Sequence, residues 1–89
     1  MTEGFQIARR LRGCEILGFG PTTADKHVRE GLLPKLISVG ARAKGWPVHE
    51  LYAINRARAA GWSDERIREL VRELERARQE QAPTVAEAA

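Results

Sequence analysis

Two features are scarce in this 89-residue sequence: cysteine and long apolar runs. The single cysteine excludes an intrachain disulfide and fits a reducing compartment. No stretch approaches the roughly 20 apolar residues that span a bilayer. The beginning of the chain, MTEGFQIARRLRG, also lacks the continuous apolar segment of a signal peptide. We therefore expect a cytoplasmic protein that has no membrane partner.

Patterns typical of catalysis and of metal binding are also missing. We find no nucleophile paired with a base, no acid pair and no glycine-rich loop that could cradle a phosphate, so we expect no enzymatic activity and no cofactor. Cys14, His27 and His49 fall in three separate segments without the paired spacing of zinc ligands. We therefore expect no metal site. Instead, we predict that Cys14 lies in the core and that His27 is half-buried against the first helix.

The charge of the chain is unevenly distributed. The net charge is +3 and the isoelectric point is near 9.6. Residues 1–60 carry ten Lys or Arg and five Asp or Glu, whereas residues 61–89 carry five Arg and seven Asp or Glu. The basic excess therefore lies in the first two-thirds of the chain, where it could serve as the footprint of a polyanion. Many ordinary proteins are this basic, so charge alone favours nucleic acid only modestly.

The first half of the chain predicts two short helices and a β-hairpin. We expect helices over 11–17 and 22–30, ended by Gly18 and Gly31, with Pro21 in the first turn of the second helix. Leu36, Ile37 and Val39 favour a strand. A turn over 40–45 follows, and a return strand closed by Pro47 completes the hairpin, or wing.

Two further helices are predicted in the second half. The third covers 48–60, and the fourth covers 64–79 with Ser63 as its N-cap. Trp46 is predicted in the core, and Trp62 is placed to pack on Ile67 at the start of the fourth helix. We divide the chain into a flexible N-terminus (residues 1–8, with a short strand as the alternative), a DNA-binding domain (9–61), a charged amphipathic helix (62–81) and a disordered tail (82–89).

The order helix, tight turn, helix, hairpin, helix is typical of a winged helix-turn-helix. We therefore predict a mainly α fold with a small β-hairpin and an added C-terminal helix. In DNA-reading versions of this arrangement the second helix enters the major groove. Thr22, Thr23, Lys26 and Arg29 supply hydroxyls and cations suited to bases and phosphates, although the two threonines could simply cap the helix.

Residues 9–79 resemble the AlpA-type prophage regulators, small DNA-binding proteins related to MerR-like winged helices and phage excisionases. The segments that carry the resemblance are REGLLPK (29–35), VGARAKGWP (39–47) and AINRARAAGWSDERIRELV (53–71). The resemblance implies binding to double-stranded DNA that regulates transcription of phage-type genes or assists excision. By position it places Thr22, Thr23, Lys26 and Arg29 on the recognition helix, and Arg42 and Lys44 on the wing.

Three positions depart from the family pattern. Gly20-Pro21 replaces a polar pair, Asp25 replaces an aromatic residue, and His27 replaces an apolar one. Asp25 could accept a hydrogen bond from a cytosine amino group or pair with Arg29 one helical turn away. The predicted DNA-binding residues are Thr22, Thr23, Asp25, Lys26, Arg29, Lys35, Arg42 and Lys44.

The sequence is also compatible with two other functions. One is an excisionase-like architectural factor that bends DNA. Another is a protein-interaction module that has kept the fold and lost DNA readout. The narrow apolar stripe of the fourth helix fits packing within the chain or a homodimer. We expect Ile67 and Val71 to pack inside, and Leu70 and Leu74 to be available to a partner.

Overall fold

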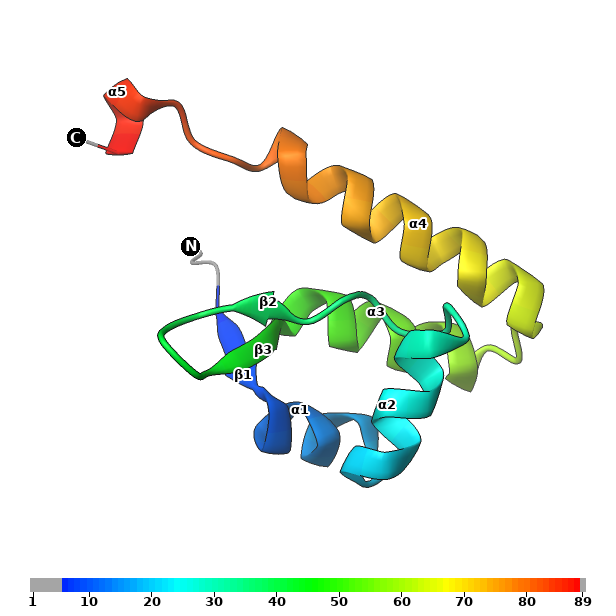
Figure 1. The fold of residues 1–89 in the computed structure, drawn as a ribbon. Helices are drawn as coiled ribbons and strands as arrows, with labels where there is room; N and C mark the ends of the chain where they lie inside the picture. The colour runs from blue at the N-terminus through cyan, green and yellow to red at the C-terminus, as the bar shows by residue number, and fades with distance from the viewer. Residues whose placement is uncertain (1–5, 89) are drawn as a thin grey trace.

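The computed structural model describes residues 6–88, which form a mainly helical fold with a small three-stranded antiparallel sheet (Figure 1). The elements in chain order are β1 (Ile7–Arg9), α1 (Arg10–Leu17), α2 (Pro21–Arg29), β2 (Ile37–Ser38), β3 (Lys44–Pro47), α3 (Val48–Ala59), α4 (Asp64–Glu80) and α5 (Val85–Ala88). Within this part of the chain, no helix combines the length and the apolar character needed to cross a membrane.

The four predicted helices and the hairpin are confirmed, and each helix boundary agrees within one residue. Gly18, Gly31 and Gly61, which follow α1, α2 and α3, have φ angles of 84°, 79° and 80°, a left-handed conformation that glycine adopts readily. The Ser63 hydroxyl accepts a hydrogen bond from the Arg66 amide at 3.3 Å, so the predicted N-cap of α4 is confirmed.

The predicted strand over Leu36–Val39 is shorter than expected. For the N-terminal segment, the prediction of flexibility is wrong for residues 7 and 8, where the alternative, a short strand, is confirmed. β1 pairs with β3, which is the central strand and also pairs with β2. Gly45 of β3 allows the backbone of β1 to approach closely, because a Cβ atom there would collide with the Ala8 carbonyl oxygen. A strand this short depends on a partner, which the local sequence does not reveal. Residues 1–5 of the predicted flexible segment lie outside the described residues.

The prediction that residues 82–89 are disordered is also wrong for part of that segment, because residues 85–88 form α5. Thr84 and Glu87 form a capping box: the Thr84 amide donates to Glu87 Oε1 at 2.7 Å, and the Glu87 amide donates to Thr84 Oγ1 at 3.1 Å. This Thr-x-x-Glu spacing was readable in the sequence. α5 lies apart from the rest of the fold in Figure 1, and its Val85 is 89% exposed.

Trp46 of β3 occupies the centre of the core, as predicted. Its side chain is fully buried, and its indole N–H donates a hydrogen bond to the Pro34 carbonyl at 2.7 Å. Gly13 of α1 packs on the indole so closely that a Cβ atom at this position would lie 2.5 Å from the ring. The buried apolar residues are Ala8, Cys14, Ala24, Leu32, Leu33, Trp46, Leu51, Ile54, Ala57, Ile67 and Val71. The predicted core position of Cys14 is therefore confirmed.

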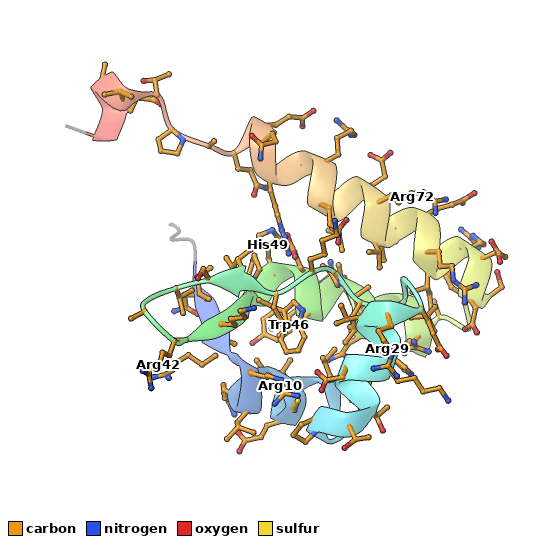
Figure 2. The ribbon with its side chains drawn as sticks, in the orientation of Figure 1. Arg10, Arg29, Arg42, Trp46, His49 and Arg72 are labelled. Carbon is orange, nitrogen blue, oxygen red and sulfur yellow. The ribbon has the colours of Figure 1, made fainter. Side chains whose placement is uncertain are left out.

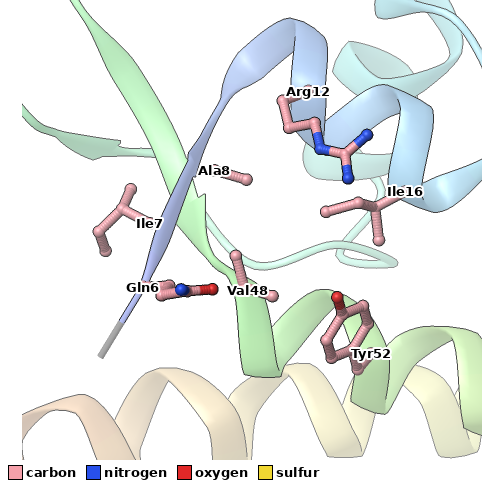
Figure 3. Close-up of a pocket in the computed structure, with 7 residues that line it drawn as sticks. All are labelled: Gln6, Ile7, Ala8, Arg12, Ile16, Val48 and Tyr52. Atoms are coloured by element: carbon pink, nitrogen blue, oxygen red, sulfur yellow. The ribbon is translucent and has the colours of Figure 1, made fainter. Parts of the chain in front are cut away.

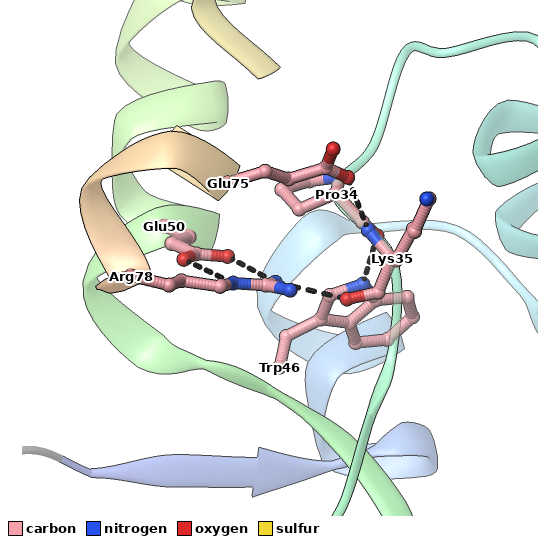
Figure 4. A network of polar contacts seen from close by, with 6 residues as sticks. All are labelled: Pro34, Lys35, Trp46, Glu50, Glu75 and Arg78. Carbon is pink, nitrogen blue, oxygen red and sulfur yellow. Dashed lines mark hydrogen bonds and ion pairs between the residues drawn. The ribbon is translucent and has the colours of Figure 1, made fainter. Parts of the chain in front are cut away.

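A buried ion pair fastens α4 to the rest of the fold (Figure 4). The Glu50 carboxylate on α3 is fully buried and accepts two hydrogen bonds from Arg78, at 2.7 and 2.8 Å. The same guanidinium donates to the Lys35 carbonyl at 2.9 Å, and Glu75 accepts from the Lys35 amide at 2.8 Å. α4 is therefore held to α3 and to the segment that joins α2 to β2.

Arg78→Ala should lower the free energy of unfolding by about 3–5 kcal/mol, because it leaves the buried Glu50 carboxylate without its partner. Urea titration followed by circular dichroism would measure the loss. Arg76→Ala is the matched control, since Arg76 pairs with Glu73 and Glu80 on the exposed face of the same helix and should change stability little. The double variant Glu50→Leu, Arg78→Met should recover much of the stability. Equal stability of the two single variants would contradict a stabilising role for the buried pair.

Candidate nucleic-acid interface

The exposed face of α2 carries the residues predicted to read DNA. Ala24 is fully buried and Val28 is half-buried, so this side of the helix faces the core. Thr22, Thr23, Lys26 and Arg29 are all exposed. The N-cap of α2 is Gly20, and no side chain caps the helix, so the reading of Thr22 and Thr23 as caps is wrong. Their hydroxyls remain available to a ligand.

The hairpin presents two more of the predicted residues. The Val39 amide donates to the Ala43 carbonyl at 2.9 Å and closes the tip, and Arg42 and Lys44 are exposed beside it. Figure 2 places Arg42 on this tip, Arg10 on α1 and Arg29 on α2, whereas Arg72 lies on α4, across the fold from α1. The hairpin and the exposed face of α2 therefore flank the beginning of α1.

A basic groove that the sequence did not indicate lies between α1 and the hairpin. It has a volume of about 330 Å³. Its lining residues are Arg9, Arg10, Leu11, Arg42, Ala43 and Lys44. We call these residues the basic groove. Arg9 and Arg10 were missed because they lie at the end of β1 and the beginning of α1, where surface cations are common. Only the folded hairpin brings Arg42 and Lys44 to them.

Asp25 pairs with Arg10 across the two helices. Arg10 Nη2 donates to Asp25 Oδ2 at 2.7 Å and lies 3.5 Å from the Pro21 carbonyl oxygen. The expected pair between Asp25 and Arg29 is wrong, because the carboxylate is turned toward α1. The hydrogen bond that Arg10 donates to Asp25 raises the pKa of Arg10, so the guanidinium stays charged. The negative charge of Asp25 on α2 is therefore neutralised by the neighbouring Arg10 on α1.

Lys35 lies away from the other predicted residues. Its side chain is exposed, and it lines a shallow pocket with Val28 and Gly31 at the end of α2 and with residues of α4 that include Arg68 and Arg72. Its backbone amide and carbonyl are the groups that Glu75 and Arg78 hold. The structure thus groups Lys35 with α4, and not with the exposed face of α2 or with the hairpin tip.

His27 is half-buried, as expected, and it packs against Phe19 in the turn that follows α1. The two rings meet edge to face with their centroids 4.9 Å apart. Burial lowers the pKa of His27, and the positive charge of Arg58 lowers it further. The Nδ1 atom is buried without a hydrogen-bond partner among the described residues. In residues 6–88 no three His, Cys, Asp or Glu side chains gather as a metal site would require.

The apolar stripe of α4 divides as predicted between buried and more exposed positions. Ile67 and Val71 are buried, whereas Leu70 and Leu74 are half-buried at the edge of the core. Leu70 and Trp62 line a hollow of about 210 Å³ beside α3. The Arg66 guanidinium lies 4.1 Å from the centre of the Trp62 ring and covers it, a cation–π contact.

Another pocket, of about 370 Å³, lies among β1, α1 and α3 (Figure 3). It is lined by Gln6, Ile7, Ala8, Arg12, Ile16, Val48 and Tyr52. Arg12 lies two residues after Arg10 on α1, so the two side chains leave the helix on nearly opposite faces. This pocket is therefore separate from the basic groove, and its lining mixes apolar side chains with the polar groups of Gln6, Arg12 and Tyr52.

Comparison with protein-family models, curated proteins and solved structures finds no significant match to the chain. The resemblance to AlpA-type regulators therefore stays a prediction. The arrangement of side chains described above is therefore the basis for inferring a function.

Proposed function

We propose that the protein binds double-stranded DNA as a small transcriptional regulator of the winged helix-turn-helix type. The observation that carries the proposal is the exposed face of α2, where Thr22, Thr23, Lys26 and Arg29 stand clear of the core beside a basic hairpin. The helix α1, the tight turn at Gly18 and the helix α2 form the helix-turn-helix, and β2–β3 forms the wing.

The roles of the parts follow from their chemistry. The threonine hydroxyls near the beginning of α2, and the Arg29 guanidinium at its end, suit hydrogen bonds to base edges in the major groove. Cations on the hairpin suit the phosphate backbone, which supplies affinity without sequence information. α4 carries six of the twelve acidic residues and lies across the fold from α1, so it would face away from a duplex bound on the side of α1 (Figure 2).

The direct test is fluorescence anisotropy of the full chain with labelled genomic duplexes at low salt. We expect binding whose affinity falls linearly with the logarithm of salt concentration, because each neutralised phosphate releases counterions. A bend detected in the bound duplex would favour the excisionase-like alternative. Absence of binding across a genomic library would reject the proposal and favour the protein-interaction module.

Substitutions should separate base readout from phosphate contact. Arg29→Ala or Thr23→Ala should change the preferred sequence, with a loss of about 1–3 kcal/mol at the affected base. Arg42→Ala should weaken binding to all sequences about equally. Arg72→Ala, which removes an exposed arginine from α4, is the control. It should leave both the preferred sequence and the affinity for DNA nearly unchanged. Selection of bound sequences from a random pool would measure the preference. Identical motifs for the Thr23, Arg29 and wild-type proteins would reject this division of roles.

We also propose that α4 supports a homodimer through Leu70 and Leu74, which would place two copies of α2 on two half-sites. Light scattering should show dimers that the double substitution Leu70→Glu, Leu74→Glu converts to monomers. Circular dichroism serves as the control for folding, because both leucines are half-buried. A wild-type protein that remains monomeric at high concentration, free and on DNA, would overturn the dimer.

A further inference from the structure

We propose that the basic groove binds the sugar-phosphate backbone of DNA and that Asp25 is a positioning residue that holds Arg10 at this groove. The inference rests on the proposed function and extends it to residues outside the recognition helix and the hairpin tip. It also assigns a specific task to the one acidic residue on the exposed side of α2.

The groove concentrates positive charge from three segments of the chain, and of its four cations only Arg10 has a carboxylate partner among residues 6–88. Arg9 ends β1, Arg10 begins α1, and Arg42 and Lys44 come from the hairpin. No carboxylate lines the groove, and within residues 6–88 none pairs with Arg9, Arg42 or Lys44. Cations brought together in this way repel one another and attract a polyanion.

The remaining lining of the groove suits a nucleic-acid backbone better than an isolated anion. Leu11 is 67% exposed, and Ala43 lies beside Lys44 at the hairpin tip. These two residues place apolar surface among the cations, which matches the alternation of deoxyribose and phosphate along a strand. The volume of about 330 Å³ also exceeds what a single phosphate group would fill.

Arg10 remains able to bind a phosphate while it is paired. Its hydrogen bonds to Asp25 and to the Pro21 carbonyl both use Nη2, so no residue of the described range 6–88 engages the N–H groups on Nε and Nη1. The short pair with Asp25 restricts a long side chain that would otherwise have to be ordered on binding. Because Asp25 belongs to α2, the pair also couples the basic groove to the recognition helix.

The experiment measures DNA affinity against salt for Arg10→Ala, for Asp25→Asn and for the double variant. Arg10→Ala should weaken binding and reduce the salt slope by about 0.9, the value for one lost phosphate contact. Asp25→Asn should weaken binding several-fold although it removes a negative charge. In the Arg10→Ala background the same change should have no effect or tighten binding.

Controls separate positioning from a general loss of structure. Arg72→Ala removes an equal charge from α4 and should leave the salt slope nearly unchanged. The preferred sequence, selected from a random pool, should be the same for wild type, Arg10→Ala and Asp25→Asn, whereas a misplaced α2 would alter it. If Arg10→Ala does not fold, Arg9→Ala and Lys44→Ala test the groove, because both side chains are exposed and leave the Arg10–Asp25 pair intact.

Three outcomes would overturn the inference. Tighter binding by Asp25→Asn in both backgrounds would mean that Asp25 only repels DNA. An unchanged slope in the Arg10, Arg9 and Lys44 variants, with wild-type DNA binding intact, would reject the groove and leave the proposed function standing. A wild-type protein that binds no duplex DNA would reject both proposals.

Discussion

The indole of Trp46 connects the central strand of the sheet to the segment between α2 and β2. It is fully buried, donates a hydrogen bond to the Pro34 carbonyl and packs against α1 at Gly13, where no larger residue would fit. An unpaired buried donor is costly, so this bond and the packing around it favour one arrangement of these elements. The position of the hairpin relative to α1 and α2 depends on that contact.

α4 holds the same connecting segment from the other side. Arg68 donates to the Glu30 carbonyl at 2.8 Å, next to the end of α2. Glu75 and Arg78 bind the amide and the carbonyl of Lys35, which directly follows the proline that Trp46 holds. The buried Glu50 keeps Arg78 in place. The amphipathic helix that was predicted for partner contacts therefore also braces the segment that joins α2 to the hairpin.

The two sides of the fold differ in whether their charged side chains are paired. Acidic and basic side chains on α4 pair with each other, as in the contacts of Arg76 with Glu73 and Glu80. On the side of α1 and the hairpin, Arg10 is the one cation of the basic groove that has such a partner among the described residues, and that partner is Asp25. This asymmetry is the electrostatic basis for our proposal that DNA binds on the side of α1, α2 and the hairpin.

The sequence by itself determined the elements that depend on local interactions. Helix boundaries followed from glycines able to adopt positive φ, from Pro21 in a first turn and from the Ser63 cap, all of which act within a few residues. Thr22, Thr23, Lys26 and Arg29 were selected for their hydroxyl and cationic side chains, and all four are exposed. The capping box of Thr84 and Glu87 was equally local, and it was overlooked.

Only the tertiary structure decided which distant residues meet. Asp25 had a suitable partner one turn away in Arg29, yet it pairs with Arg10, which is 15 residues earlier. Glu50 and Arg78, 28 residues apart, look like ordinary surface charges on two amphipathic helices and form a buried pair. Arg9 and Arg10 join Arg42 and Lys44 only because β1 pairs with β3. The periodicity of side chains along an element predicts which face of the element a residue occupies. Pairing between residues of different elements depends instead on how those elements pack, and the whole core around Trp46 determines that packing.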